Sequence, residues 1–202
     1  MKLILITTPT YFVEEDKIIT ALFEEGLDVL HLRKPDTAPM FAERLLTLIP
    51  EQYRKRIVVH GHFYLKEEYM LKGIHLNGRN PNPPENYKGH ISCSCHSLDE
   101  VKERKSGRDY VFLSPVFDSI SKQNYNSAYT PEELRAASKA GIIDKRVMAL
   151  GGIDENNIIE VKDYGFGGAA ILGALWGKFD ACCDSDYRLL IEHFRKLKKL
   201  AD

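Results

Sequence analysis

Two cationic side chains follow directly on a short apolar run near the start of the chain. In "LHLRKPD", from Leu30 to Asp36, Arg33 and Lys34 come immediately after the run. A guanidinium group offers two parallel donors to phosphate oxygens, and an ammonium group adds a mobile point charge. This segment therefore predicts either an anion site or a solvated surface pair.

Hydroxyl groups and one lysine follow a second apolar run. The stretch "DYVFLSPVFDSISKQNYNSAY" carries Ser119, Ser121 and Lys122 shortly after "VFLS". Such a stretch is either a solvated loop or a loop that holds an anion.

Glycines end two further apolar runs. "ALGGID" contains Gly151 and Gly152, and "GFGGAAILGAL" contains Gly173 followed by Ala174. Glycine lets backbone N–H groups approach a ligand closely, and a following helix start favours negative charge. We expect these turns to bind phosphate; the alternative is that the glycines only form tight turns.

Eight short β-rich runs alternate with segments of helical periodicity. The predicted strands cover residues 2–7, 27–33, 56–60, 73–77, 90–95, 109–114, 146–150 and 167–173. The predicted helices cover residues 16–25, 39–48, 97–104, 131–139, 155–164 and 186–200. The segment 78–89 contains three prolines and predicts a short turn at most.

This alternation predicts an α/β fold, a (β/α)8 TIM barrel formed by a single domain over residues 1–202. A doubly wound open sheet is the alternative. The first predicted strand is followed by "TTPTYF", which lacks the glycine fingerprint typical of that fold.

In such a barrel the active site lies at the carboxyl ends of the strands. The residues expected there are rich in cations, imidazoles and hydroxyls, and the nearest carboxylates are Asp36 and Asp118. They are Thr7, Thr8, His31, Arg33, Lys34, His60, His62, His75, Asn77, Asn80, Ser94, His96, Ser114, Ser119, Ser121, Lys122, Gly151, Gly152 and Gly173. Strand ends with this composition suit an anionic substrate.

The bulk composition excludes several classes of partner. A net charge of −1 provides no general attraction for nucleic acid or anionic membrane. No segment approaches the roughly 18 apolar residues of a membrane span, and the first residues do not resemble a signal peptide. Cys93 and Cys95 alternate along a predicted strand and are expected to be buried thiols, whereas adjacent Cys182 and Cys183 are poorly placed for a bridge. We therefore expect a cytoplasmic protein.

Taken in order, these segments resemble the thiamine-phosphate synthase family, including its tautomerase branch, over essentially the whole chain. The family motifs "QLR", "GVHLGQ", "SVHS", "DYVGVGPVFPTxTK", "AIGGI" and "GADGVAVVSAI" are similar to "HLR", "GIHLNG", "SCHS", "DYVFLSPVFDSISK", "ALGGI" and "GFGGAAILGAL".

The resemblance implies an enzyme of thiamine biosynthesis. In the synthase, hydroxymethylpyrimidine pyrophosphate loses pyrophosphate, and the thiazole phosphate nitrogen captures the resulting cation, with Mg²⁺ and basic residues neutralising the leaving group. Carried over by position, Arg33 and Lys122 would hold pyrophosphate. Ser119, Ser121, Gly152, Gly173 and Ala174 would hold the thiazole phosphate or the adjoining ring.

The sequence departs from the family pattern where the metal would bind. The "ND" after the third strand is His60-Gly61, and the aspartate of "GQED" aligns with Asn80. The glutamine of "QLR" is His31, and the lysine that follows is Pro35, with Lys34 a candidate substitute. Mg²⁺ is therefore implied by the synthase resemblance, although both expected aspartate ligands are absent.

The tautomerase branch requires no metal, only acid–base groups around a thiazole phosphate. His31, His60 and His62 would supply groups that titrate near neutrality. However, the histidine which that branch carries after the sixth strand is Pro115 here. A third possibility is a barrel without catalysis that binds a thiamine-related phosphate.

The sequence thus predicts catalytic roles for Arg33, Lys122, His31 and His60. The predicted substrate-binding residues are Lys34, His62, Asn77, Asn80, Ser94, Ser119, Ser121, Gly151, Gly152, Gly173 and Ala174. The expected partners are a phosphorylated thiazole and a pyrimidine pyrophosphate. Oligomeric state is left open.

Overall fold

A computed structural model describes residues 1–117, 129–177, 179 and 187–202 of the chain. Eight parallel strands pair in chain order, and β1 pairs with β8, so that the sheet closes. The strands are β1 (Lys2–Ile6), β2 (Val29–Leu32), β3 (Ile57–Val59), β4 (Gly73–Leu76), β5 (His90–Cys95), β6 (Tyr110–Leu113), β7 (Val147–Leu150) and β8 (Gly168–Ile171). The predicted barrel is confirmed, and the open doubly wound sheet is wrong because the β1–β8 pairing leaves no edge.

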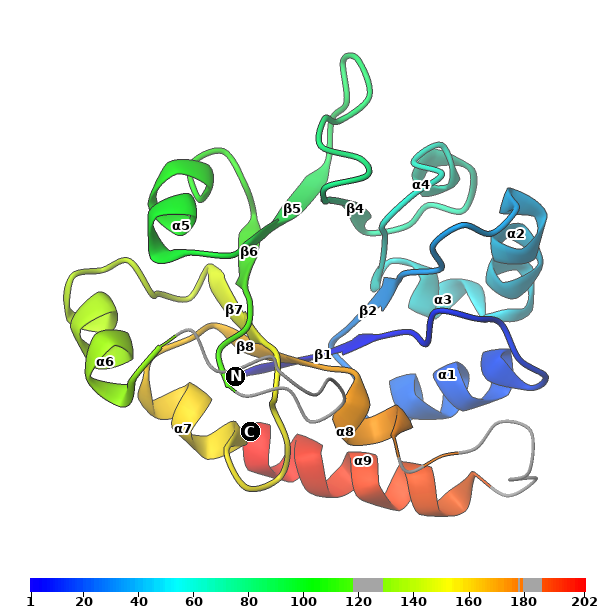
Figure 1. Cartoon of the computed structure of the whole chain (residues 1–202). Helices are drawn as coiled ribbons and strands as arrows, with labels where there is room; N and C mark the ends of the chain where they lie inside the picture. Colours follow the sequence, from blue (N-terminus) through cyan, green and yellow to red (C-terminus); the bar gives the residue numbers. More distant parts are fainter. Residues whose placement is uncertain (118–128, 178, 180–186) are drawn as a thin grey trace.

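Helices surround the strands (Figure 1). They are α1 (Glu15–Glu24), α2 (Pro39–Leu48), α3 (Glu51–Arg54), α4 (Leu65–Glu68), α5 (Leu98–Arg104), α6 (Pro131–Lys139), α7 (Ile158–Asp163), α8 (Gly173–Trp176) and α9 (Arg188–Ala201). None of these described helices is both long and apolar enough to cross a bilayer.

The predicted helix boundaries are mostly confirmed, and so is the chemistry of their caps. The Ser97 hydroxyl accepts a hydrogen bond from the Glu100 N–H, and Thr130 forms a complete capping box with Glu133. The helix predicted from residue 155 begins later, at Ile158. Its first residues instead form a turn in which the Asn157 carboxamide oxygen accepts from the Asp154 N–H. The short helices α3, α4 and α8 were not predicted, because a single turn is too short to show a periodic pattern.

No helix lies between β4 and β5, as the prolines predict, and this connection extends away from the barrel as a loop (Figure 1).

The strands alternate between two faces, so that they build two cores. The outward-facing residues pack against the helices and include Cys93 and Cys95, which are buried free thiols as predicted. The inward-facing residues form a smaller apolar cluster that includes Ile4, Tyr110 and Phe112. Polar inward residues are concentrated on β4 and β5, as His75, Ser92 and Ser94, with His31 on β2, and the barrel interior therefore has an apolar side and a polar side.

Candidate active site at the carboxyl ends of the strands

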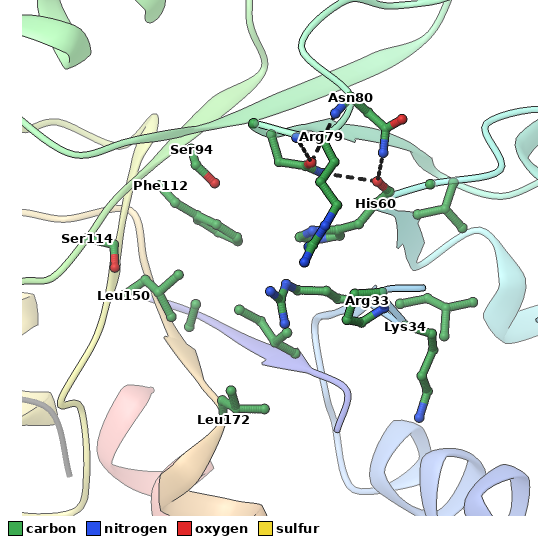
Figure 2. Close-up of a pocket in the computed structure, with 18 of the residues that line it drawn as sticks. Arg33, Lys34, His60, Arg79, Asn80, Ser94, Phe112, Ser114, Leu150 and Leu172 are labelled. Carbon is green, nitrogen blue, oxygen red and sulfur yellow. Dashed lines mark hydrogen bonds between the residues drawn. The ribbon is translucent and has the colours of Figure 1, made fainter. Parts of the chain in front are cut away.

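A cavity of about 930 Å³ opens at the carboxyl ends of the strands (Figure 2). It is lined by most of the predicted site residues that the structure describes, which are Arg33, Lys34, His60, His62, Asn77, Asn80, Ser94, Gly151, Gly152, Gly173 and Ala174. Ser119, Ser121 and Lys122 lie outside the described residues, so their predicted roles remain predictions. The β-strand ends thus bring together residues that are up to 141 positions apart in the chain, from Arg33 to Ala174.

Two arginines dominate the charge of the cavity. Figure 2 shows the side chains of Arg33 and Arg79 extending from different segments into the cavity that both residues line. Thr7 fixes the backbone of Arg33, because its hydroxyl accepts from the Arg33 N–H at 3.0 Å and donates to the Arg33 carbonyl at 3.1 Å. Two like charges directed at one place are favourable when an anion lies between them.

Arg79 was missed by the sequence prediction. It lies in the turn after β4, where the Asn77 carboxamide oxygen accepts from the backbone N–H groups of Arg79 and Asn80. Its guanidinium group is mostly exposed, and Nη2 lies 3.7 Å from the Asp36 carboxylate. This is a weak surface pair, which leaves the other donors of Arg79 available to a ligand.

Lys34 does not present its ammonium group to the two arginines, contrary to expectation. Nζ pairs with the buried Glu15 carboxylate, and it donates to the Thr8 hydroxyl at 3.2 Å and to the Thr10 carbonyl at 2.7 Å. Figure 2 shows the side chain pointing away from Arg33. All three donors of the ammonium are thereby used within the protein, so Lys34 supports the loop after β1, and its predicted contact with a substrate remains a prediction.

Burial of the Lys34–Glu15 ion pair removes both charged groups from water, which is unfavourable. Burial raises the pKa of the Glu15 carboxyl to about 7, although Lys34 opposes the shift, and burial lowers the pKa of Lys34.

His31 lies beneath the cavity and not on its wall, which differs from the predicted catalytic role. It is fully buried, with Nδ1 2.8 Å from His60 Nε2 and Nε2 2.6 Å from the Tyr110 hydroxyl. His60 does line the cavity, and its ring stacks on that of His75 with centroids 4.2 Å apart. His31 is therefore linked to the cavity through its contact with His60.

The predicted titration of His31 and His60 near neutrality is wrong. Burial, together with the neighbouring histidines and nearby cations, lowers the pKa of both imidazoles well below 6.5. The same causes lower the pKa of His75 to about 3. These rings are neutral at physiological pH and act as hydrogen-bonding groups.

His62 lies at the outer part of the cavity. It has a positive φ of 49°, and Nε2 lies 3.1 Å from the Thr37 carbonyl. Its ring is separate from the buried histidines.

Amide and hydroxyl groups line the wall around His60. The carboxamide nitrogens of Asn77 and Asn80 donate to the His60 carbonyl at 3.0 and 2.9 Å, and Ser94 lies 2.9 Å from His75 Nε2. These bonds fix the wall below the arginines.

The glycine turn after β7 lies on another side of the cavity, with the Leu150 side chain across from His60 (Figure 2). Gly151 and Gly152 have φ angles of 99° and 65°, a region that favours glycine. A β-carbon at Gly151 would lie 2.9 Å from Pro115, so glycine is also required by space. With Gly173 at the start of α8, this is the arrangement expected for the predicted phosphate cradle.

The described residues that line the cavity do not fit Mg²⁺. A β-carbon added at Gly61 would lie 3.7 Å from the Asn80 carboxamide nitrogen, so the two positions where the family carries aspartates are neighbours here and neither is acidic. Among the described residues that line the cavity, Asp36 supplies the one carboxylate, and it is 80% exposed and paired with Arg79. A hard cation that prefers carboxylate oxygens has no such pair of ligands.

Imidazole nitrogens are the other candidate ligands. One nitrogen each from His31, His60 and His75 lies within 4.8 Å of the other two. Such a donor set suits a softer cation.

Comparison with known proteins places the chain among thiamine enzymes. The family model described as thiamine monophosphate synthase matches residues 3–175. A thiamine-phosphate synthase of Actinobacillus succinogenes is 33% identical over 131 residues, which are 61% of this chain and 59% of that protein. A thiamine-phosphate synthase of Prochlorococcus marinus is 27% identical over 91% of this chain and 53% of its own length. The chain thus spans less than two thirds of the length of these two curated relatives.

Solved structures agree with the sequence matches. The crystal structure of thiamine phosphate pyrophosphorylase from Bacteroides thetaiotaomicron has a TM-score of 0.94 and 67% identity, covering 100% of this chain and 98% of that one. A thiamine phosphate pyrophosphorylase from Pyrococcus furiosus, at 21% identity and a TM-score of 0.73 over 99% and 95% of the two chains, shares the fold. On the extent of the family match and the similarity to the first of these structures, the chain belongs to the thiamine monophosphate synthase family.

Proposed function

We propose that this protein is a thiamine-phosphate synthase, which joins hydroxymethylpyrimidine pyrophosphate to thiazole phosphate and releases pyrophosphate. The observation that carries the proposal is the pair of guanidinium groups, from Arg33 and Arg79, in a cavity that also contains the glycine turns. Family membership supports it independently.

The pyrophosphate leaving group would lie between the two arginines. As the bond between the pyrimidine methylene carbon and the pyrophosphate oxygen breaks, its electron pair moves to that oxygen. Arg33 and Arg79 would stabilise the developing charge through charge-assisted hydrogen bonds. No step needs to pass through Mg²⁺, for which the cavity lacks the aspartate pair.

The pyrimidine methylene cation left behind would lie against the aromatic side of the cavity. Phe112 lines the cavity and packs against both His31 and His75, with ring centroids 4.7 and 4.9 Å away. The face of an aromatic ring attracts a cation. Neutral His60 and the two carboxamides beside it offer no carboxylate to trap that cation.

The thiazole phosphate would be held at the opposite side of the cavity. The turn at Gly151 and Gly152 and the start of α8 at Gly173 would supply backbone N–H donors to its phosphate. Its ring nitrogen then attacks the methylene carbon, which forms the new C–N bond of thiamine phosphate. Ser119, Ser121 and Lys122 remain predicted contributors to these phosphate contacts.

One set of assays tests this proposal against the two other functions open from the sequence. Purified protein is incubated with both synthase substrates and Mg²⁺, and separately with the carboxylated thiazole phosphate tautomer. We expect thiamine phosphate in the first reaction. Absence of that product at micromolar enzyme contradicts the synthase. Turnover of the tautomer alone would indicate tautomerase chemistry, and binding without turnover would indicate a non-catalytic barrel.

A cytoplasmic location is part of the proposal, supported by the two buried free thiols Cys93 and Cys95.

A further inference from the structure

Three imidazoles meet inside the barrel, immediately below the cavity. His31 is on β2, His60 follows β3 and His75 is on β4, so three adjacent strands fix their positions. One ring nitrogen of each lies within 4.8 Å of the other two, and the closest pair, His31 Nδ1 and His60 Nε2, is 2.8 Å apart. This arrangement depends on the fold and not on a flexible loop.

Hydroxyl partners on the other ring nitrogens of His31 and His75 would orient these two rings as ligands. His31 Nε2 lies 2.6 Å from the Tyr110 hydroxyl. The two nitrogens of His75 lie 2.9 Å from the Ser92 and Ser94 hydroxyls, so whichever nitrogen binds an ion, the other keeps a serine. Histidines that bind metals usually have such a partner on the second nitrogen.

The charge around the cluster bears on what completes the site. Imidazole binds a metal through the lone pair of a neutral ring, and Arg33 lines the same cavity as His60. Because its guanidinium group opposes a further positive charge, a cation bound here would favour an anionic fourth ligand.

We propose that His31, His60 and His75 form a binding site for one divalent transition-metal ion of the zinc class. Imidazole nitrogen is a ligand for Zn²⁺, Co²⁺ and Ni²⁺, whereas Mg²⁺ prefers oxygen. His60 lies on the cavity wall while His31 and His75 are buried behind it, so the ion reaches the site through the cavity. The open fourth position then faces the cavity, where a phosphate or substrate oxygen would bind.

Metal binding requires a small adjustment of the rings. Bonds of about 2.0–2.1 Å in a tetrahedral site place ligand nitrogens roughly 3.3 Å apart. The distance of 2.8 Å between His31 Nδ1 and His60 Nε2 must lengthen slightly. The widest nitrogen–nitrogen distance in the cluster, up to 4.8 Å, must shorten. His60 is the least buried of the three residues and lies on the cavity wall.

The site is tested on the full chain, independently of the proposed function. Zn²⁺ is titrated calorimetrically in phosphate-free buffer into the wild type, His60→Asn and the control His62→Asn, which changes a cavity histidine outside the cluster. We expect one Zn²⁺ per wild-type chain, at least about 10-fold weaker binding in His60→Asn, and no change in the control. Co²⁺ should give the visible absorption of a tetrahedral site in the wild type and lose it in His60→Asn.

Several outcomes overturn the proposal. They are no stoichiometric Zn²⁺ binding at tens of micromolar protein, binding that His60→Asn leaves intact, or equal losses in His62→Asn. If His60→Asn does not fold, X-ray absorption on the wild type decides instead. Three nitrogen ligands with imidazole scattering support the site, and fewer than three imidazoles contradict it.

Discussion

Gly61 and Asn80 are spatial neighbours, since a β-carbon added at Gly61 would lie 3.7 Å from the Asn80 carboxamide nitrogen. Asn80 uses that nitrogen to donate to the His60 carbonyl at 2.9 Å. The two positions where family members carry aspartates thus remain side by side, while the carboxylates are replaced by a hydrogen bond to the backbone. In the proposed reaction, Arg33 and Arg79 would balance the charge of the pyrophosphate.

Restoring the two carboxylates should create a Mg²⁺ site. In calorimetric titrations, Gly61→Asp/Asn80→Asp should bind Mg²⁺ at millimolar concentration, because two adjacent carboxylates supply the ligands that this cation prefers. The wild type and the uncharged control Gly61→Asn should give no signal. Equal Mg²⁺ binding by the wild type would contradict our description of the site.

Removal of either cavity arginine should weaken pyrophosphate binding. A charge-assisted hydrogen bond contributes about 1.5–3 kcal/mol, so Arg33→Ala should raise the dissociation constant about 10-fold or more. Arg79→Ala should have a smaller effect of the same sign, because its guanidinium is 58% exposed. The control is Arg135→Ala, on α6, whose guanidinium lies 3.6 Å from Glu132. An unchanged affinity in both cavity variants, or an equal loss in the control, would exclude the arginine pair.

The buried Glu15–Lys34 pair should make stability depend on pH. The pKa of Glu15 is about 7 in the folded protein, above its ordinary value of 4.5, so folding favours the protonated form. The stabilisation that comes from the preference of the folded protein for protonated Glu15 is fully present below pH 4.5. It is lost as the pH rises through 7. Between pH 5 and pH 8 the wild type should lose on the order of 2–3 kcal/mol relative to Glu15→Gln.

Urea unfolding of both proteins at the two pH values measures this difference. Glu14→Gln, which changes an exposed carboxylate paired with Lys17, should show no comparable trend. A difference between wild type and Glu15→Gln that is constant with pH, or that grows in favour of the wild type as pH rises, would contradict the assignment.

Gly151 should tolerate substitution much less well than another glycine of positive φ. Gly151→Ala places a β-carbon 2.9 Å from Pro115 and keeps a φ of 99°, whereas Gly107→Ala at φ 72° meets nothing within 4 Å. We expect a cost of about 1–2 kcal/mol for Gly107→Ala from backbone strain, and about 1–3 kcal/mol more for Gly151→Ala from the clash. Unfolding in urea gives both values. Equal costs would show that the contact with Pro115 does not constrain the turn.

The fold could be predicted from the sequence because each strand carries its own apolar pattern, and α5 and α6 begin at recognisable side-chain caps. The cavity could also be predicted, since closure of the barrel brings all the strand ends together whatever their loops contain. The role of Lys34 could not be predicted, because it depends on Glu15, a carboxylate at the start of α1 that is buried only in the folded chain. Arg79 was missed because a mostly exposed arginine in a turn carries no pattern of its own.

The protonation states of the histidines could not be predicted from the sequence either. Their positions at strand ends were predicted, but their pKa values depend on burial beneath the cavity and on one another. A ring that looks available for acid–base catalysis in the sequence is a neutral hydrogen-bonding group in the barrel.

The most direct test of the synthase is a ³¹P NMR time course with hydroxymethylpyrimidine pyrophosphate and thiazole phosphate. Our account predicts that pyrophosphate and thiamine phosphate appear in equal amounts only when both substrates are present, and that Arg33→Ala slows both together. Failure of the wild type to release pyrophosphate with both substrates and Mg²⁺ supplied would contradict it.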